Sequence, residues 1–190
     1  MLRRAGRRGA PRLGHGATLG SQLVVGPRQQ SIGLPQSPFV RIVLQRVTRS
    51  AVIVDGTVVG SIDEGLLILV GIEPSDSGED IAAAVDKVSN LRVFADSGGH
   101  MNRSLLDVGG SALVVSQFTL LGDVRKGRRP SFTGAASPEM AEPMVEHFAE
   151  ALRQTGIPTE TGVFAATMEV ELVNDGPVTL VLEVRDGRVS

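Results

Sequence analysis

The sequence predicts one α+β domain with a mixed, largely antiparallel and barrel-like sheet and two main helices. From residue 40 onward, runs of β-branched residues of strand length dominate, and only two stretches have helical periodicity. Because the strands come in runs and do not alternate regularly with helices, an α+β arrangement is favoured over a Rossmann-like fold. A length of 190 residues leaves little room for a second domain.

The first part of this domain is predicted to form strands joined by tight turns. Arg41–Val47 and Ala51–Val54 are rich in β-branched residues, and Asp55-Gly56 is typical of a two-residue hairpin turn. The continuous apolar run Leu66–Ile72 predicts a strand buried on both faces. It is also the longest apolar run, far shorter than the ~20 residues of a membrane-spanning helix.

Two helices are predicted from capping residues followed by an apolar face. Ser77 and Asp80 have capping-box spacing ahead of the first face. Ser137 followed by Pro138 marks the start of the second helix, which Gly156 ends.

The remaining strands are predicted around and after the second helix. Ala112–Leu121 is a strand whose second half turns polar, and Met168–Val173 and Val178–Val184 are the last two strands of the domain. The segment Asn174–Thr179 lies between these last two strands.

The composition excludes several kinds of site. The chain has no cysteine, which excludes disulfides, a thiolate nucleophile, zinc ribbons and iron–sulfur clusters. It has three scattered histidines and no G-x-S-x-G, Walker, dinucleotide or H-E-x-x-H motif. We therefore expect no metal, no cofactor and no conventionally activated side-chain nucleophile.

Residues 1–39 differ sharply from the rest of the chain. They contain six of the nineteen basic residues and no acidic one, with no sustained apolar periodicity, so we expect a disordered Arg/Gly-rich tail. An organelle-targeting segment, a nucleic-acid-binding arm and an upstream extension without a role are three open interpretations. The other residues hold thirteen basic and twenty-one acidic groups, a net charge of −8, which excludes a uniformly basic nucleic-acid-binding surface.

Two polar segments are not explained by regular secondary structure alone. Ser116–Leu120 places polar side chains in a buried strand, which indicates either a strand end that converges on a ligand or one that reaches the surface. Asn174–Thr179 contains an Asp-Gly turn signal, but Pro177 cannot donate to a strand ladder, so the alternative is a rigid Gly-Pro unit with free carbonyls.

A local cluster of cations follows the first polar segment. Arg125, Lys126, Arg128 and Arg129 fall within five positions of an otherwise acidic domain. Such a cluster predicts an anion site for phosphate, with a solvated loop as the alternative.

Several motifs in fixed order resemble the D-aminoacyl-tRNA deacylase family, also called the D-tyrosyl-tRNA deacylase family. The resemblance covers the chain from Arg41 to Val184. Five motifs carry it: R-x-V-x-Q-R-V at 41–47, S-Q-F-T at 116–119, K-G-x-R-P-x-F at 126–132, G-x-F-x-A-x-M at 162–168 and N-x-G-P-V-T at 174–179. The family pattern begins one residue before Arg41, so residues 1–39 have no counterpart and Val40 is a candidate true start.

The resemblance implies a cytoplasmic homodimer with no membrane segment. Members of the family hydrolyse the ester that joins a D-amino acid, or glycine mischarged on tRNA-Ala, to the 3′ end of tRNA. Their active site lies at the subunit interface, where the S-Q-F-T strand of one subunit faces a Gly-cis-Pro unit of the other. Carried over to this sequence, Gly176 and Pro177 would contact the substrate amino group and exclude L side chains.

The remaining site residues follow from the same motifs. The substrate's ribose 2′-OH would help to activate water, while the protein orients the ester and stabilises the oxyanion. The catalytic set is Ser116, Gln117, Phe118 and Thr119. The substrate-binding set is Phe164, Ala166, Met168, Asn174, Gly176, Pro177, Val178 and Thr179, of which the first three could equally be core. Lys126, Arg128 and Arg129 would contact RNA phosphate.

The expected organisation is therefore a tail at 1–39, a deacylase domain at 40–184 and a short C-terminal tail at 185–190. Two other functions remain open at this point. One is a non-catalytic nucleic-acid-binding dimer that uses the basic loop and the tail, and the other is a dimer that serves interaction only.

Overall fold

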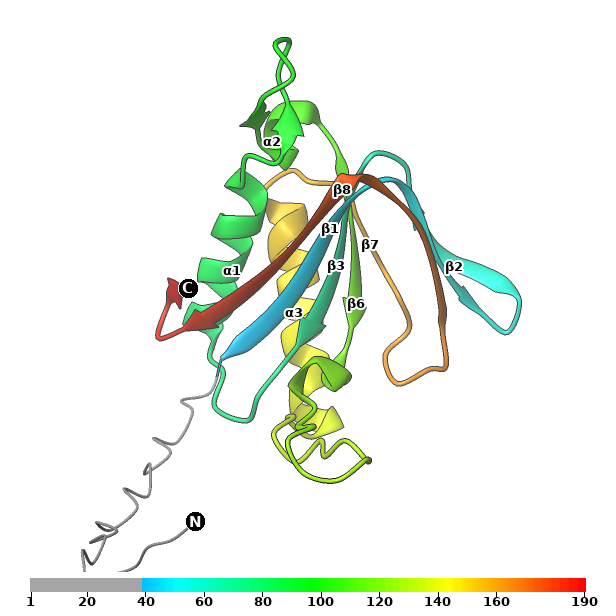
Figure 1. The fold of residues 1–190 in the computed structure, drawn as a ribbon, viewed down its shortest axis with the longest axis vertical. Helices are drawn as coiled ribbons and strands as arrows, with labels where there is room; N and C mark the ends of the chain where they lie inside the picture. Colours follow the sequence, from blue (N-terminus) through cyan, green and yellow to red (C-terminus); the bar gives the residue numbers. More distant parts are fainter. Residues whose placement is uncertain (1–38) are drawn as a thin grey trace, which may run out of the picture. The chain divides into compact units, whose positions relative to one another are not determined.

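A computed structural model describes residues 39–190, so the expectations for the tail lie almost entirely outside the described residues. A seven-stranded mixed sheet organises this part of the chain, in the order β7-β6-β3-β1-β8-β9, with β2 paired to β1 (Figure 1). The β3–β6 and β6–β7 pairs are parallel and the others are antiparallel. The strands are β1 (Val40–Val54), β2 (Thr57–Ile62), β3 (Gly65–Gly71), β6 (Ser111–Ser116), β7 (Thr159–Thr161), β8 (Glu169–Arg185) and β9 (Arg188–Val189).

Helices α1 and α3 cover one face of this sheet (Figure 1). A short hairpin and a short helix lie between α1 and β6, and a 3₁₀ turn follows β6. The bounds are α1 (Gly78–Asn90), β4 (Phe94–Ala95), β5 (Met101–Arg103), α2 (Leu105–Val108), η1 (Phe118–Leu121) and α3 (Pro138–Gln154). The predicted α+β class with two main helices is confirmed. Within the described residues, no helix has the length and apolar character needed to cross a membrane.

The capping residues determine where the helices begin. Ser77 and Asp80 form the predicted capping box at α1, with each side chain bonded to the main-chain N–H of the other residue. Helix α3 starts at Pro138, where a missing N–H costs nothing, and Gly156 beyond its end has a φ of +94°. Helix α2 was not predicted from the sequence, although Ser104 and Asp107 form a second capping box there.

The core has two parts, one on each face of the sheet. The larger lies under the helices and includes Ile42, Leu66, Ile68 and Phe148. The smaller lies on the opposite face, which we call the open face, and includes Leu67. Strand β3 supplies both parts, so the prediction of a strand buried on two faces is confirmed.

The hairpin between β1 and β2 also follows the prediction. Asp55 and Gly56 both have positive φ, at 49° and 75°, and Val54 pairs with Thr57 across the turn. These values match the two-residue turn whose twist suits adjacent antiparallel strands.

The predicted strand Ala112–Leu121 is too long. Strand β6 ends at Ser116, and the chain then turns into η1. The main-chain N–H of Gln117 still donates to the Val70 carbonyl at 2.7 Å, and the N–H of Leu120 turns back to the Gln117 carbonyl at 3.1 Å. The polar residues thus mark the point where pairing with β3 stops.

The prediction of two final strands joined by a turn is also wrong. Strand β8 runs without interruption from Glu169 to Arg185, because both of its halves pair with the single long strand β1. The register shifts twice in its middle, between Gln45 and Val47 and between Val47 and Arg49, and the first shift is the larger, since Gln45 pairs with Thr179 and Val47 with Asn174. One residue of β1 therefore lies opposite four residues of β8, which form a bulge at 175–178.

Candidate functional site

A cavity of about 570 Å³ opens where β6 passes into η1. Six predicted site residues line it, and they come from two segments far apart in the sequence: Ser116, Gln117, Phe118, Phe164, Ala166 and Met168. Its other walls come from β3, β6, β8 and the start of α3. Every side chain that lines it is neutral, and apart from one hydroxyl and one amide all are apolar. The cavity can therefore hold an uncharged organic group and offer it a few directed polar contacts.

The turn η1 forms one side of this cavity. The Gln117 side-chain amide donates to the hydroxyl of Thr119, which is itself exposed and does not line the cavity. Phe118 is 55% exposed, and its ring meets that of Phe132 edge-on with centroids 5.1 Å apart. A helical turn leaves its first N–H groups without partners inside the turn, which makes the N–H groups of Phe118 and Thr119 candidate donors.

The opposite side is a tight segment between β7 and β8. The Gly162 N–H donates to the Val114 carbonyl at 3.0 Å and anchors the segment to β6. Ala165 has a φ of +58°, in the left-handed region that few L-residues adopt. This turn places Phe164 and Ala166 in the wall of the cavity.

The other predicted substrate-binding residues lie in the bulge of β8 or, for Asn174 and Thr179, directly beside it, and they do not line this cavity. Asn174 closes the bulge, because its side chain accepts from the Val178 N–H at 2.9 Å and donates to the Val178 carbonyl at 3.1 Å. Its amide also approaches the Thr179 hydroxyl at 3.3 Å. The peptide bond between Gly176 and Pro177 is cis.

Arg46, on strand β1, holds the bulge in place. Its Nε lies 2.9 Å from a carboxylate oxygen of Asp175 and 3.1 Å from the carbonyl of the same residue. A second donor bonds to the Val93 carbonyl. The Arg46 side chain is only 11% exposed, and its contacts hold the bulge to β1 and to Val93, in the connection between α1 and β4.

The basic loop lies between η1 and α3 and is exposed. Arg125 is occupied within it, since its guanidinium contacts both carboxylate oxygens of Asp123 at 2.8 and 2.9 Å. These hydrogen bonds lower the pKa of Asp123. Lys126, Arg128 and Arg129, the predicted phosphate contacts, are exposed in the same loop.

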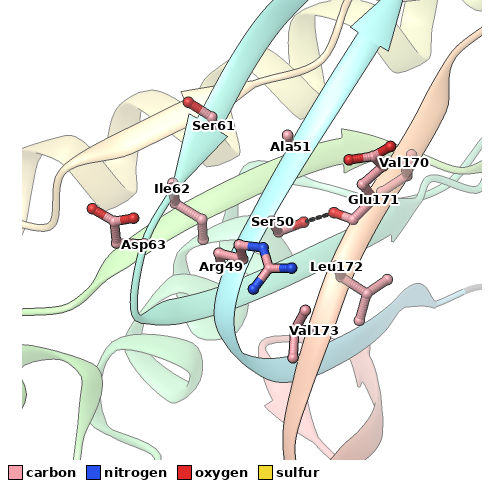
Figure 2. A pocket seen from close by; sticks show the side chains of 10 residues that line it. All are labelled: Arg49, Ser50, Ala51, Ser61, Ile62, Asp63, Val170, Glu171, Leu172 and Val173. Atoms are coloured by element: carbon pink, nitrogen blue, oxygen red, sulfur yellow. Dashed lines mark hydrogen bonds between the residues drawn. The ribbon is translucent and has the colours of Figure 1, made fainter.

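A second cavity, of about 610 Å³, lies among β1, β2 and β8 (Figure 2). None of the predicted site residues lines it. Its charged groups are Arg49, Asp63 and Glu171, and the Ser50 hydroxyl donates to the Glu171 carbonyl at 2.7 Å. A smaller cavity of about 240 Å³ shares Ser116 and Phe164 with the first.

Several residues that line the first cavity were not predicted from the sequence. Phe132 belongs to the K-G-x-R-P-x-F motif and was a visible candidate, because large apolar residues are rare in that polar loop. The positive φ of Ala165 left no signal in the sequence. Val70, Ile72, Val115 and the alanines of the α3 start reach the cavity only through the tertiary fold.

The family model described as D-Tyr-tRNA(Tyr) deacylase matches residues 43–183 of the chain. The chain belongs to this deacylase family. A D-aminoacyl-tRNA deacylase of Thermomicrobium roseum is 60% identical over 154 residues, which cover 80% of this chain and all of that protein. The predicted family and enzyme class are thereby confirmed.

Two solved structures resemble the deacylase fold described here. One, described as the c-Myc DNA unwinding element binding protein, is 42% identical with a TM-score of 0.71, and the match covers 75% of this chain and 97% of the other. The second, described as a probable eukaryotic D-amino acid tRNA deacylase, has a TM-score of 0.66 at 16% identity, covering 76% and 99%. At that identity the second comparison shows the fold alone.

Proposed function

We propose that this chain hydrolyses D-aminoacyl-tRNA in the cytoplasm, with the 3′-terminal adenosine and its amino acid in the cavity between η1 and the segment at 162–168. One observation carries the proposal: residues of two separate family motifs, Ser116–Phe118 and Phe164–Met168, line a single cavity of about 570 Å³. Small-molecule sites span roughly 300–1,000 Å³ and are mostly apolar with a few polar groups. Residues 40–184 would form this deacylase domain.

The neutral lining suits a reaction in which the substrate supplies its own reactive hydroxyl. An aminoacyl ester is already activated, and the adjacent ribose 2′-OH can assist the attacking water. The enzyme then needs to orient the ester and stabilise the developing oxyanion. We assign the oxyanion contact to main-chain N–H groups of η1 together with Thr119, and adenine stacking to Phe164, Ala166 and Met168.

A second copy of the chain would complete the site. On the open face, a cross-strand row of apolar residues runs over β8, β1, β3 and β6 towards the cavity: Val181, Val43, Leu69 and Val115. Val181 is 59% exposed, so this row offers apolar surface for a symmetric partner. Such a dimer would bring the bulge of one subunit to the cavity of the other.

The bulge would then select the substrate. The carbonyls of Gly176 and Pro177 would accept from the substrate's amino group, and the backbone beside them would leave no room for an L side chain. Asn174, Val178 and Thr179 keep the bulge in shape through the hydrogen bonds described above. Glycine has no side chain to exclude, so glycine on tRNA-Ala would also be hydrolysed. Lys126, Arg128 and Arg129 would contact the phosphates of the tRNA end.

The test is hydrolysis of D-tyrosyl-tRNA and L-tyrosyl-tRNA by the purified protein at equal concentrations. We expect rapid loss of the D-ester and no enzyme-dependent loss of the L-ester. Equal hydrolysis of both, or hydrolysis of neither, rejects the proposal. Sedimentation measures the dimer in the same preparation.

A nucleic-acid-binding role is the second candidate, because one solved structure of similar fold is described as a DNA unwinding element binding protein. The exposed cations of the basic loop are the surface that this role would use. Filter binding to duplex DNA, with and without residues 1–39, separates the two. Tight binding without ester cleavage would favour the second role.

A further inference from the structure

Arg41 connects the sheet to the turn that carries the S-Q-F-T segment. Its Nε and Nη2 donate to one carboxylate oxygen of Glu183, at 3.1 and 2.8 Å. Its Nη1 donates to the main-chain carbonyl of Leu120, inside η1, at 2.8 Å. A guanidinium presents its donors in a fixed plane, so this side chain ties the end of η1 to Glu183 on strand β8.

The orientation of this guanidinium is itself fixed. Arg41 pairs with Glu183 across β1 and β8, so the two side chains leave the same face of the sheet. The ring of Phe39 lies 4.4 Å from the guanidinium carbon, a cation–π distance, and Arg41 is 28% exposed. Neither charged residue lines the cavity.

The other end of the turn is fixed by β3. The Gln117 N–H donates to Val70 at 2.7 Å, and Gly71, the β3 partner of Arg41, leaves the space that the turn occupies. The start of η1 is therefore attached to β3 and its end to Arg41. Between the two attachments lie Phe118 and Thr119.

We propose that Arg41, oriented by Glu183, is a positioning residue for deacylation. It acts through the Leu120 carbonyl to set the direction of the Thr119 hydroxyl and of the N–H groups of η1. The inference rests on the proposed function, because it places the reacting ester against η1. The proposal includes no direct contact between Arg41 and the tRNA.

The experiment is single-turnover hydrolysis of D-tyrosyl-tRNA by wild type, Arg41→Lys, Glu183→Ala and the double variant, with enzyme in excess over a range of concentrations. Lysine keeps the charge but cannot bond to both acceptors as a planar fork. Because a displacement of ~1 Å can cost ~10²-fold in rate, we expect the maximal rate to fall about 10- to 100-fold in Arg41→Lys. The half-saturating concentration should change by less than about twofold, since binding contacts are unaltered.

The two single losses should not add, because both act through one contact. Arg92→Met is the matched control: it removes an exposed arginine that follows α1, and its rate should equal that of wild type. Melting temperature and sedimentation are recorded for each variant, because a purely structural role would change these and leave the single-turnover rate of the folded dimer intact. If Arg41→Ala folds, added guanidinium ion should restore part of its rate.

Three results overturn the inference. An unchanged maximal rate in Arg41→Lys means that the Leu120 contact does not position the site. A raised half-saturating concentration at an unchanged rate means that Arg41 binds the tRNA directly. Absence of hydrolysis by the wild type rejects the proposed function and the inference with it. Because the wild type is assayed beside the variants, this result cannot be confused with the other two.

Discussion

Replacing Gly71 by alanine tests how closely the site depends on the end of β3. A Cβ atom at this position would lie 3.2 Å from the Gln117 carbonyl oxygen and 3.3 Å from both Leu120 Cβ and Leu121 Cγ. All three neighbours belong to η1 or the residue before it. The turn must therefore shift by a few tenths of an ångström, and it must shift away from β3.

Two magnitudes follow from this geometry. An extra methyl group in a packed region costs ~1–3 kcal/mol, which for a domain of this size lowers the melting temperature by about 2–12 °C. If ~1 Å of misplacement costs ~10²-fold in rate, then a shift of a few tenths costs about four- to tenfold. We expect both effects in Gly71→Ala.

Gly78→Ala is the matched control. No heavy atom lies within 4 Å of a Cβ there, the φ of Gly78 is not positive, and alanine favours a helix by ~1 kcal/mol. This variant should melt at the wild-type temperature or above and hydrolyse D-tyrosyl-tRNA at the wild-type rate. The assays are thermal unfolding and single-turnover hydrolysis. A Gly71→Ala protein with wild-type turnover would refute the claim that η1 positions the ester.

Thr119→Ala should lower turnover by about 10²–10³-fold, the effect of losing one oxyanion donor. Its melting temperature should not change, because the side chain is exposed. Wild-type turnover in this variant would show that Thr119 is not part of the site. Replacing Lys126, Arg128 and Arg129 together by glutamine should raise KM and flatten its dependence on salt, at unchanged kcat; an unaltered salt slope would contradict a phosphate role. Burial raises the pKa of Asp76 to about 6. The folded state therefore binds this proton more tightly than the unfolded state does. As a result, the contribution of Asp76 to the free energy of unfolding falls as the pH rises from about 4 to 6. Asp76→Asn should melt with a smaller decline over that range, and parallel melting curves for both proteins would show that Asp76 does not titrate there.

Local signals in the sequence predicted local structure well. The Asp55-Gly56 turn and the Ser77 capping box each depend on residues within a few positions, and both are confirmed. The continuity of β8 depends instead on β1, more than a hundred residues away, and no local signal at Asn174–Thr179 shows that one strand pairs with both halves. A turn prediction was the natural result of proline and glycine signals taken alone.

The residues of the candidate site also divide into those that the sequence predicts and those that only the tertiary fold brings together. The motifs identified Ser116–Phe118 and Phe164–Met168, and the fold brings both to one cavity. Phe132 and Ala165 were missed because their positions depend on a ring contact and on a left-handed backbone conformation. The roles of Gly176 and Pro177 remain predictions, since in one chain they do not line that cavity.

The central position of β1 has a consequence for synthesis on the ribosome. Its partner β8 begins at Glu169, more than a hundred residues after the end of β1, so the first of the described strands to emerge stays unpaired on that side until β8 has been translated. Until then the β1 edge that β8 will cover offers free N–H and C=O groups over up to fifteen residues, which invites pairing with other nascent chains. Cells that make this protein rapidly should therefore depend on chaperones that shield the β1 edge during elongation.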